Sequence, residues 1–254
     1  MDNAEYRSRR DFLSRAFLDL GIDRCVIVTG SFRAGTTLLC DLLAQNGVPS
    51  PGDEKFSHFY QMRAPSKSAA FEDAMVNILK SAVDGLFATK LMWPHRNELA
   101  ACLGFDRSHA RDFAKIFPGA RWINVVRSDK IDQSISFWKA KKTNRWHVYA
   151  DLEAEPELEF DAAGIRKAYA ELSIHDDMWK LFHDEAGTSP IEIVYEDFLA
   201  DMETNVDRLL NNLGAGHAPS PSGRRYKPNL LMQRNAQSER LKQQFLNYSY
   251  LTGD

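Results

Sequence analysis

The stretch that decides the fold runs from Val26 to Cys40 and reads VIVTGSFRAGTTLLC. It begins with β-branched residues, passes through a Gly/Ser turn and a second glycine, and enters an apolar run opened by two threonines. This order predicts a buried strand, a tight loop and a helix. The first turn of a helix has backbone N–H groups without intrahelical acceptors and the positive end of the helix dipole. The stretch therefore predicts an anion-binding loop.

The form of the loop limits which anion it suits. Gly30 and Gly35 keep the glycine spacing of the nucleoside triphosphatase motif G-x-x-x-x-G-K-[ST]. Thr36 stands where that motif has the lysine that contacts the β- and γ-phosphates, and a basic residue lies within the loop at Arg33. We therefore expect a single terminal phosphate, held by backbone amides, the hydroxyls of Thr36 and Thr37, and the Arg33 guanidinium. The alternative is an ordinary capped turn between strand and helix.

Composition sets the broad class. The chain has 254 residues, of which 44% are hydrophobic and 26% charged, and we expect one domain over residues 1–254. A net charge of −3 argues against a general nucleic-acid binder. The three cysteines show no C-x-x-C spacing, and Cys25 and Cys40 lie in apolar strand and helix patterns, so we expect buried free thiols there and a cytoplasmic protein. The charged N-terminus does not resemble a secretory signal, and no apolar run approaches the ~20 residues of a membrane span.

Hydrophobic periodicity gives the order of the elements. We expect strands over 25–29, 86–92, 121–126 and 191–195, and helices over 5–20, 36–45, 69–83, from 94, and over 129–142, 165–185, 196–213 and 230–246. Strands that alternate with helices predict an α/β fold, with a mostly parallel sheet flanked by helices and with extra helical elements.

A second basic position follows the third expected strand, in the segment 125–136, which reads VVRSDKIDQSIS. Arg127 lies at the carboxyl end of that strand, where ligands collect in open α/β sheets. A guanidinium forms paired charge-assisted bonds with phosphate, and Ser134 or Ser136 could add a hydroxyl. The alternative is a solvated helix start with Asp129 in its first turn. Together with the first loop, this segment predicts a second phosphate site.

Both segments resemble those of a known family. Residues 31–37 resemble the 5′-phosphosulfate loop of sulfotransferases that use 3′-phosphoadenosine-5′-phosphosulfate (PAPS), and residues 38–48 are similar to the Stf0 type of bacterial carbohydrate sulfotransferase. Segment 125–136 resembles the 3′-phosphate motif R-R-D-K-x-x-Q-A-x-S, which favours Ser136 over Ser134; Ser128 replaces the second arginine. The resemblance recurs from about residue 26 to residue 245.

The resemblance implies a P-loop-type sheet, PAPS as the donor co-substrate without a metal, and a carbohydrate or glycolipid acceptor. It also implies a homodimer as a candidate assembly. Two phosphate sites at neighbouring strand ends are what a 3′,5′-bisphosphorylated adenosine requires. The expected donor-binding residues are Ser31, Phe32, Arg33, Ala34, Gly35, Thr36, Thr37, Arg127 and Ser136.

Transfer to a hydroxyl group needs a base, and the loop after the first motif supplies carboxylates. The family pattern has a Glu two residues before a Phe, which matches Glu54 and Phe56. Lys55 stands between them, where the family often has an aromatic residue, and Asp53 is the rival carboxylate. The expected catalytic residues are Glu54 as general base and Arg33 as electrostatic stabiliser. The alternative is an acidic loop without a catalytic role.

Other segments resemble the family more loosely. Lys90, near the end of the second expected strand, could face the anionic centre or extend its ammonium group into solvent. Trp146-His147 closes a basic and aromatic stretch that could contact a sugar or complement its own helix dipole. Gln233-Arg234-Asn235 resembles a segment beside the nucleotide, and Tyr195-Glu196-Asp197 is expected to cap the helix that follows it.

Two other functions remain open at this point. A small-molecule kinase on the same scaffold would need Mg²⁺–ATP, and the missing lysine after Gly35 argues against it. A nucleotide-binding scaffold without activity would fit the departures at Lys55 and Ser128. The acceptor is equally open among trehalose, other sugars and glycolipids.

Overall fold

The computed structural model describes residues 3–57, 59, 68–146, 156–214, 226–228 and 235–252. Its centre is a four-stranded parallel sheet with the order β2-β1-β3-β4. The strands are β1 (Arg24–Gly30), β2 (Leu86–Met92), β3 (Ala120–Val126) and β4 (Ile191–Val194). The expected α/β class with a parallel sheet is confirmed, and each strand lies within a residue or so of its predicted position.

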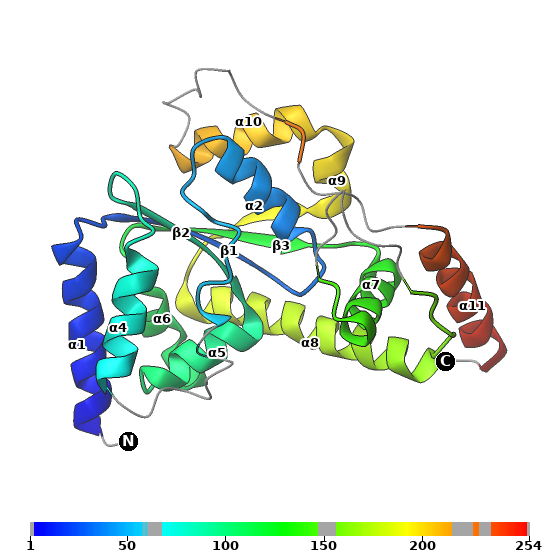
Figure 1. The fold of residues 1–254 in the computed structure, drawn as a ribbon, viewed down its shortest axis with the longest axis horizontal. Helices are drawn as coiled ribbons and strands as arrows, with labels where there is room; N and C mark the ends of the chain where they lie inside the picture. The colour runs from blue at the N-terminus through cyan, green and yellow to red at the C-terminus, as the bar shows by residue number, and fades with distance from the viewer. Residues whose placement is uncertain are drawn as a thin grey trace.

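Helices cover both faces of this sheet. They are α1 (Asn3–Asp19), α2 (Thr36–Gln45), α4 (Ser68–Leu79), α5 (Trp93–Cys102), α6 (Ala110–Ala114) after the 3-10 turn η1 (Arg107–His109), α7 (Lys130–Thr143), α8 (Ala162–Ala186), α9 (Tyr195–Ala200), α10 (Met202–Leu213) and α11 (Ala236–Thr252). Figure 1 shows α2, α9 and α10 on one face and α1, α4, α5, α6 and α8 on the other, with α11 beside α7.

The alternation of side chains along β1 divides the core in two. Cys25 and Ile27 belong to the cluster under α1, α4, α5, α6 and α8, whereas Val26 and Val28 belong to the cluster under α2 and α10. A third cluster joins α7, α8 and α11. Because β1 is an interior strand of a sheet that helices cover on both faces, its side chains are buried on either side, which explains its nearly continuous apolar sequence.

One expectation about a helix needs correction. The predicted helix over 196–213 is interrupted at Asp201, whose backbone leaves helical geometry (φ −143°) and whose side chain accepts a hydrogen bond from the Thr204 amide at 3.4 Å. An N-cap residue with this geometry begins a new helix, so the segment forms α9 and α10. The last helix, predicted from residue 230, is described from Ala236, and residues 229–234 lie outside the described part of the chain.

The cysteines are free and buried, as expected. Burial raises the pKa of the Cys40 thiol to about 12, so that side chain acts as a small apolar residue. Within the described ranges, no group of three or more His, Cys, Asp or Glu side chains is arranged to hold a metal ion. The same part of the chain contains no helix that is both long and apolar enough to cross a bilayer.

The register of the sheet brings distant segments to one edge. Gly30, the last residue of β1, pairs with Met92 at the end of β2 and with Val125 near the end of β3. The loop after β1, the start of α5 after β2 and the turn after β3 therefore leave the sheet side by side. This carboxyl edge is where parallel sheets hold their ligands.

The burial of β1 predicts how the fold responds to a cavity. The Ile27 side chain is 0% exposed, whereas the Leu18 side chain near the end of α1 is 78% exposed. We expect Ile27→Ala to lower the free energy of unfolding by about 2–5 kcal/mol, because the strands on either side of β1 cannot move in to fill the cavity that the smaller side chain leaves. Leu18→Ala should change it by less than about 0.5 kcal/mol. Urea titrations of both variants test this, and equal effects would contradict the assignment of β1 to the core.

Candidate active site

The loop between β1 and α2 has an unusual backbone. Gly30 (φ +156°) and Gly35 (φ +99°) have positive φ angles, and so does Arg33 (φ +64°), a conformation that few non-glycine residues adopt. Gly35 is the N-cap residue of α2 and no side chain caps that helix. The N–H groups in the first turn of α2 thus lack a side-chain acceptor, and this is the arrangement that binds phosphate in other folds.

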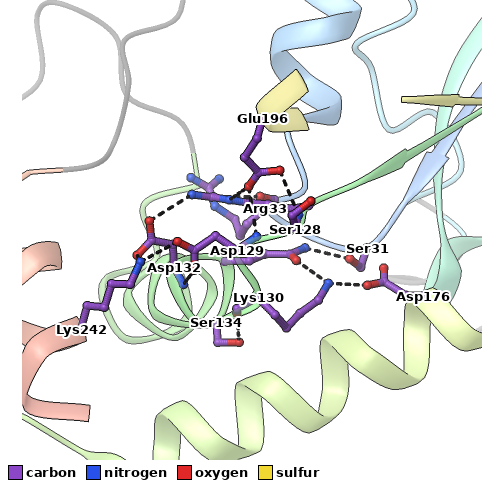
Figure 2. Close-up of polar contacts among 12 residues, drawn as sticks. Ser31, Arg33, Ser128, Asp129, Lys130, Asp132, Ser134, Asp176, Glu196 and Lys242 are labelled. Carbon is purple, nitrogen blue, oxygen red and sulfur yellow. Dashed lines mark hydrogen bonds and ion pairs between the residues drawn. The ribbon is translucent and has the colours of Figure 1, made fainter. Parts of the chain in front are cut away.

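Neighbouring elements hold this loop in place. Gln133 on α7 donates from Nε2 to Ser31 Oγ and to the Phe32 carbonyl, both at 2.8 Å. Arg33 donates from Nε to Ser136 Oγ at 3.0 Å. Figure 2 shows the polar contacts between the loop and the start of α7. Ser136 therefore lies directly against the loop.

The two candidate serines on α7 differ clearly. Ser134 is buried and donates to the Lys130 carbonyl of its own helix at 2.6 Å, whereas Ser136 contacts Arg33 in the loop. Of the two hydroxyls, the Ser136 hydroxyl is the one placed beside the predicted anion site.

Arg127 lies next to the loop but is already engaged with acidic groups. One of its terminal nitrogens donates to the Arg33 carbonyl at 3.4 Å. Its guanidinium lies 3.6 Å from a Glu196 oxygen and 3.8 Å from an Asp132 oxygen, and stacks over the Tyr195 ring at 5.1 Å. Part of its charge is thus compensated within the protein.

Glu196 has a role that the sequence did not predict. Its carboxylate accepts the amide hydrogens of Ser128 (2.9 Å) and Asp129 (3.1 Å), as Figure 2 shows. Burial alone would raise the pKa of Glu196, but these two bonds and the charge of Arg127 together lower it. The expectation that this segment caps its own helix is corrected, because the N-cap residue of α9 is Val194 and no side chain caps it. Since β4 ends beside β3, the Glu196 carboxylate instead reaches the two amides that precede α7.

Ion pairs fix the first turn of α7. Lys242 on α11 lies 2.5 Å from Asp129 and 3.0 Å from Asp132. Lys130 donates to the Gln133 side-chain oxygen at 2.6 Å and pairs with Asp176 on α8. Lys130 thus holds the side-chain amide of Gln133 in place and orients the NH₂ group of that amide toward Ser31 in the loop.

A second polar cluster surrounds Glu54. One carboxylate oxygen of Glu54 lies 3.0 Å from Lys90 Nζ, and the other lies 3.7 Å from His95 Nε2. The Lys90 ammonium also donates to Thr37 Oγ1 at 3.0 Å. Glu54 is therefore linked to the phosphate loop through one lysine.

The neighbours of Glu54 are arranged differently. The Asp53 side chain is 72% exposed and lies 3.7 Å from Lys55 Nζ. Lys55 donates to the backbone carbonyls of Ser50 (2.5 Å) and Ala88 (3.0 Å). Of the two rival carboxylates, Glu54 is the one connected to the loop after β1, through the ammonium group of Lys90.

Sequence reasoning did not select His95. Burial lowers the pKa of His95, and the nearby Glu54 carboxylate opposes that shift only in part, so the ring is neutral at pH 7. The available signal was its position in the first turn after β2, at the edge where Thr37 and Arg127 also lie. Lys90, for which two orientations were considered, points toward the anion loop.

Aromatic rings line the loop on the side of α7. Phe32 stacks on Phe137 with ring centroids 5.4 Å apart, and lies 5.8 Å from Trp146 and 6.3 Å from His95. The Trp146 carbonyl accepts a hydrogen bond from Arg33. The Trp146 side chain therefore lies beside the site, whereas His147, Gln233 and Arg234 fall outside the described residues.

The expected residues thus meet at one sheet edge. Three of them differ from the rest, because the Ser31, Ala34 and Thr36 side chains are buried, and Ala34 has only its backbone to offer a ligand. Three cationic side chains lie at this edge: Lys90 bonds to Thr37 at the start of α2, and Arg33 and Arg127 lie in and against the loop before it. This edge can bind an anion and can place a carboxylate base beside it.

Comparisons with known proteins point to one family. Residues 25–244 match the family described as Stf0 sulphotransferase. Trehalose 2-sulfotransferase from Mycolicibacterium smegmatis is 24% identical over 234 residues, which cover 77% of this chain and 86% of that protein. The protein of the same name from Mycobacterium tuberculosis is 25% identical over 118 residues, which cover 46% of this chain and 42% of that protein.

One solved structure is also similar. The sulfotransferase domain from the Synechococcus PCC 7002 olefin synthase aligns with 89% of this chain and 95% of its own, at 14% identity and a TM-score of 0.38.

The backbone of the loop allows a test with glycine variants. A Cβ atom at Gly35 would lie 2.2 Å from the Tyr195 ring, whereas one at Gly21, which also has a positive φ (+64°), would meet nothing within 4 Å. Both alanine variants pay about 1–2 kcal/mol for left-handed backbone. We expect Gly35→Ala to lose clearly more stability in thermal unfolding, and Tyr195→Ala to restore part of the difference. Equal losses at the two glycines would contradict the described contact.

Proposed function

The chain belongs to the Stf0 sulfotransferase family, and on that premise we propose that it transfers a sulfuryl group from PAPS to a hydroxyl group of a carbohydrate or glycolipid. The observation that carries this proposal is the link from Thr37 in the anion loop through Lys90 to Glu54. It sets a carboxylate within reach of a group bound at the start of α2.

The residues present fit the donor at its 5′ end. The N–H groups of α2, which no side chain caps, and the guanidinium of Arg33 would hold the 5′-phosphosulfate, which supplies the activated sulfuryl group when bound. Arg127 and Ser136 would hold the 3′-phosphate. Because Glu196 and Asp132 already compensate part of the Arg127 charge, the 3′-phosphate would have to compete with these carboxylates.

Glu54 would act as the general base. It takes the proton of the acceptor hydroxyl while the acceptor oxygen bonds to sulfur; the bond from sulfur to the 5′-phosphate oxygen breaks, and its electron pair leaves with that phosphate. His95, neutral and 3.7 Å from the second carboxylate oxygen, restrains Glu54 without adding charge. Arg33 would stabilise the charge that develops at the donor.

The acceptor side favours a sugar. The relatives are named for trehalose, which makes trehalose the first acceptor to test. Phe32 and Trp146 are both partly exposed beside the loop, and aromatic rings present an apolar face with which the C–H groups of a sugar ring can pack. A kinase is disfavoured because Thr36 stands where the lysine for the β- and γ-phosphates belongs.

Binding and turnover separate the proposed roles. We expect calorimetry to show tighter binding of adenosine 3′,5′-bisphosphate than of Mg²⁺–ATP, and labelled PAPS to sulfate trehalose or a related sugar. Glu54→Gln should lower turnover by about 100-fold or more without weakening bisphosphate binding. Arg127→Gln should instead weaken bisphosphate binding.

Each contrary result has a defined meaning. Equal losses of turnover and bisphosphate affinity in Glu54→Gln would exclude Glu54 as the base. A preference for Mg²⁺–ATP would indicate a kinase, and binding of neither nucleotide would indicate a scaffold without activity.

A further inference from the structure

Lys90 is an unusual residue in the interior of the protein. It lies in β2, opposite Val28 of the central strand, and its side chain is only 2% exposed. Within the described part of the chain, its ammonium group has two polar partners, the Thr37 hydroxyl and the Glu54 carboxylate, both at 3.0 Å. These partners belong to the two halves of the site, the anion loop and the base.

A buried ammonium group depends strongly on its counter-charge, since taking it out of water costs several kcal/mol. It has three N–H donors, and the two described partners use two of them. The third N–H group remains available to a further hydrogen-bond acceptor. The position next to Thr37 means that an anion at the start of α2 is close enough to take it.

We propose that Lys90 is a positioning residue that couples the two halves of the site, because one ammonium group serves both the base Glu54 and the anion held by the loop. This inference rests on the proposed function, since it assumes that the loop binds the donor phosphate and that Glu54 accepts the proton.

The coupling has a direct electrostatic consequence. While Glu54 is ionised, its carboxylate cancels much of the field that Lys90 exerts on the loop. When Glu54 takes the acceptor proton, that cancellation ends, and the charge of Lys90 acts fully on the phosphate that gains negative charge. Linkage requires the reverse effect as well: an anion in the loop weakens the hold of Lys90 on Glu54 and makes the carboxylate a stronger base.

A neighbouring carboxylate provides a matched control. Asp53 precedes Glu54 and carries the same charge, but it is exposed and pairs with Lys55, whose ammonium group bonds to backbone carbonyls. Removing the Asp53 charge changes the net charge of this loop by the same amount without releasing Lys90. Asp53→Asn therefore measures the effect of a screened charge in this loop, and the Lys90→Met background shows whether the Glu54 effect passes through Lys90.

The test is a calorimetric titration of adenosine 3′,5′-bisphosphate against the native chain, Glu54→Gln, Asp53→Asn, Lys90→Met and the double variant Glu54→Gln/Lys90→Met. We expect Glu54→Gln to tighten binding by about three- to tenfold, a coupling at the low end of those seen between ligand sites. Asp53→Asn should change it by less than about twofold, as exposed charges are well screened. In the Lys90→Met background, the Glu54→Gln effect should disappear.

The outcomes separate the two proposals. If the native chain does not bind the bisphosphate, the proposed function fails and the coupling fails with it. If it binds but Glu54→Gln and Asp53→Asn shift the affinity equally, or Glu54→Gln does not shift it, the function stands and the coupling is wrong. Where Lys90→Met does not fold, equal shifts in the two carboxylate variants, or no shift in Glu54→Gln, still overturn the coupling.

Discussion

The site depends on one steric constraint: the chain turns from β1 into α2 where two other strands end. A Cβ atom on Gly30 would lie 2.6 Å from the Val125 carbonyl oxygen, and one on Gly35 would lie 2.2 Å from the Tyr195 ring. Glycine at both positions therefore lets the loop pass close to β3 and to Tyr195 after β4 without a clash. The sheet thus shapes the anion site directly, and the site residues take their positions from it.

Charge at this edge is balanced rather than simply positive. Arg127 is offset by Glu196 and Asp132, and Lys90 is offset by Glu54. A chain with a net charge of −3 can keep a cationic edge stable in the absence of a ligand when each cation has an internal partner. An incoming anion must then compete with these carboxylates for the same cations. Anion binding at this edge therefore weakens ion pairs that already exist within the protein.

The fold was largely predictable because its signals are local. The β-branched run before Gly30, the two glycines and the threonines after them fix strand, loop and helix without reference to distant residues. The break at Asp201 was missed because a capping aspartate inside an amphipathic pattern looks like any surface residue. The direction of the Lys90 side chain was left undecided since it depends on the packing of β2 against α2.

The site was predictable where a local motif carries it. Residues 31–37, Arg127 and Ser136 meet as expected because each follows a strand of the same parallel sheet. The roles of His95 and Glu196 were missed because each arises from a contact between segments far apart in the chain. No spacing rule connects Glu196 to Ser128, 68 residues earlier; only the pairing of β3 with β4 brings them together.

The hydrogen bond from Trp179 to the carbonyl oxygen of Gly30 joins residues 149 positions apart. The loop is encoded early in the chain, but the groups that complete its geometry, Gln133, Trp179 and Tyr195, are all synthesised much later. During synthesis on the ribosome, the loop between Gly30 and Gly35 therefore lacks these contacts until α8 and α9 have emerged. Contacts between residues so far apart in the sequence form slowly during folding. The loop can therefore bind an anion only after the chain has been synthesised as far as α9.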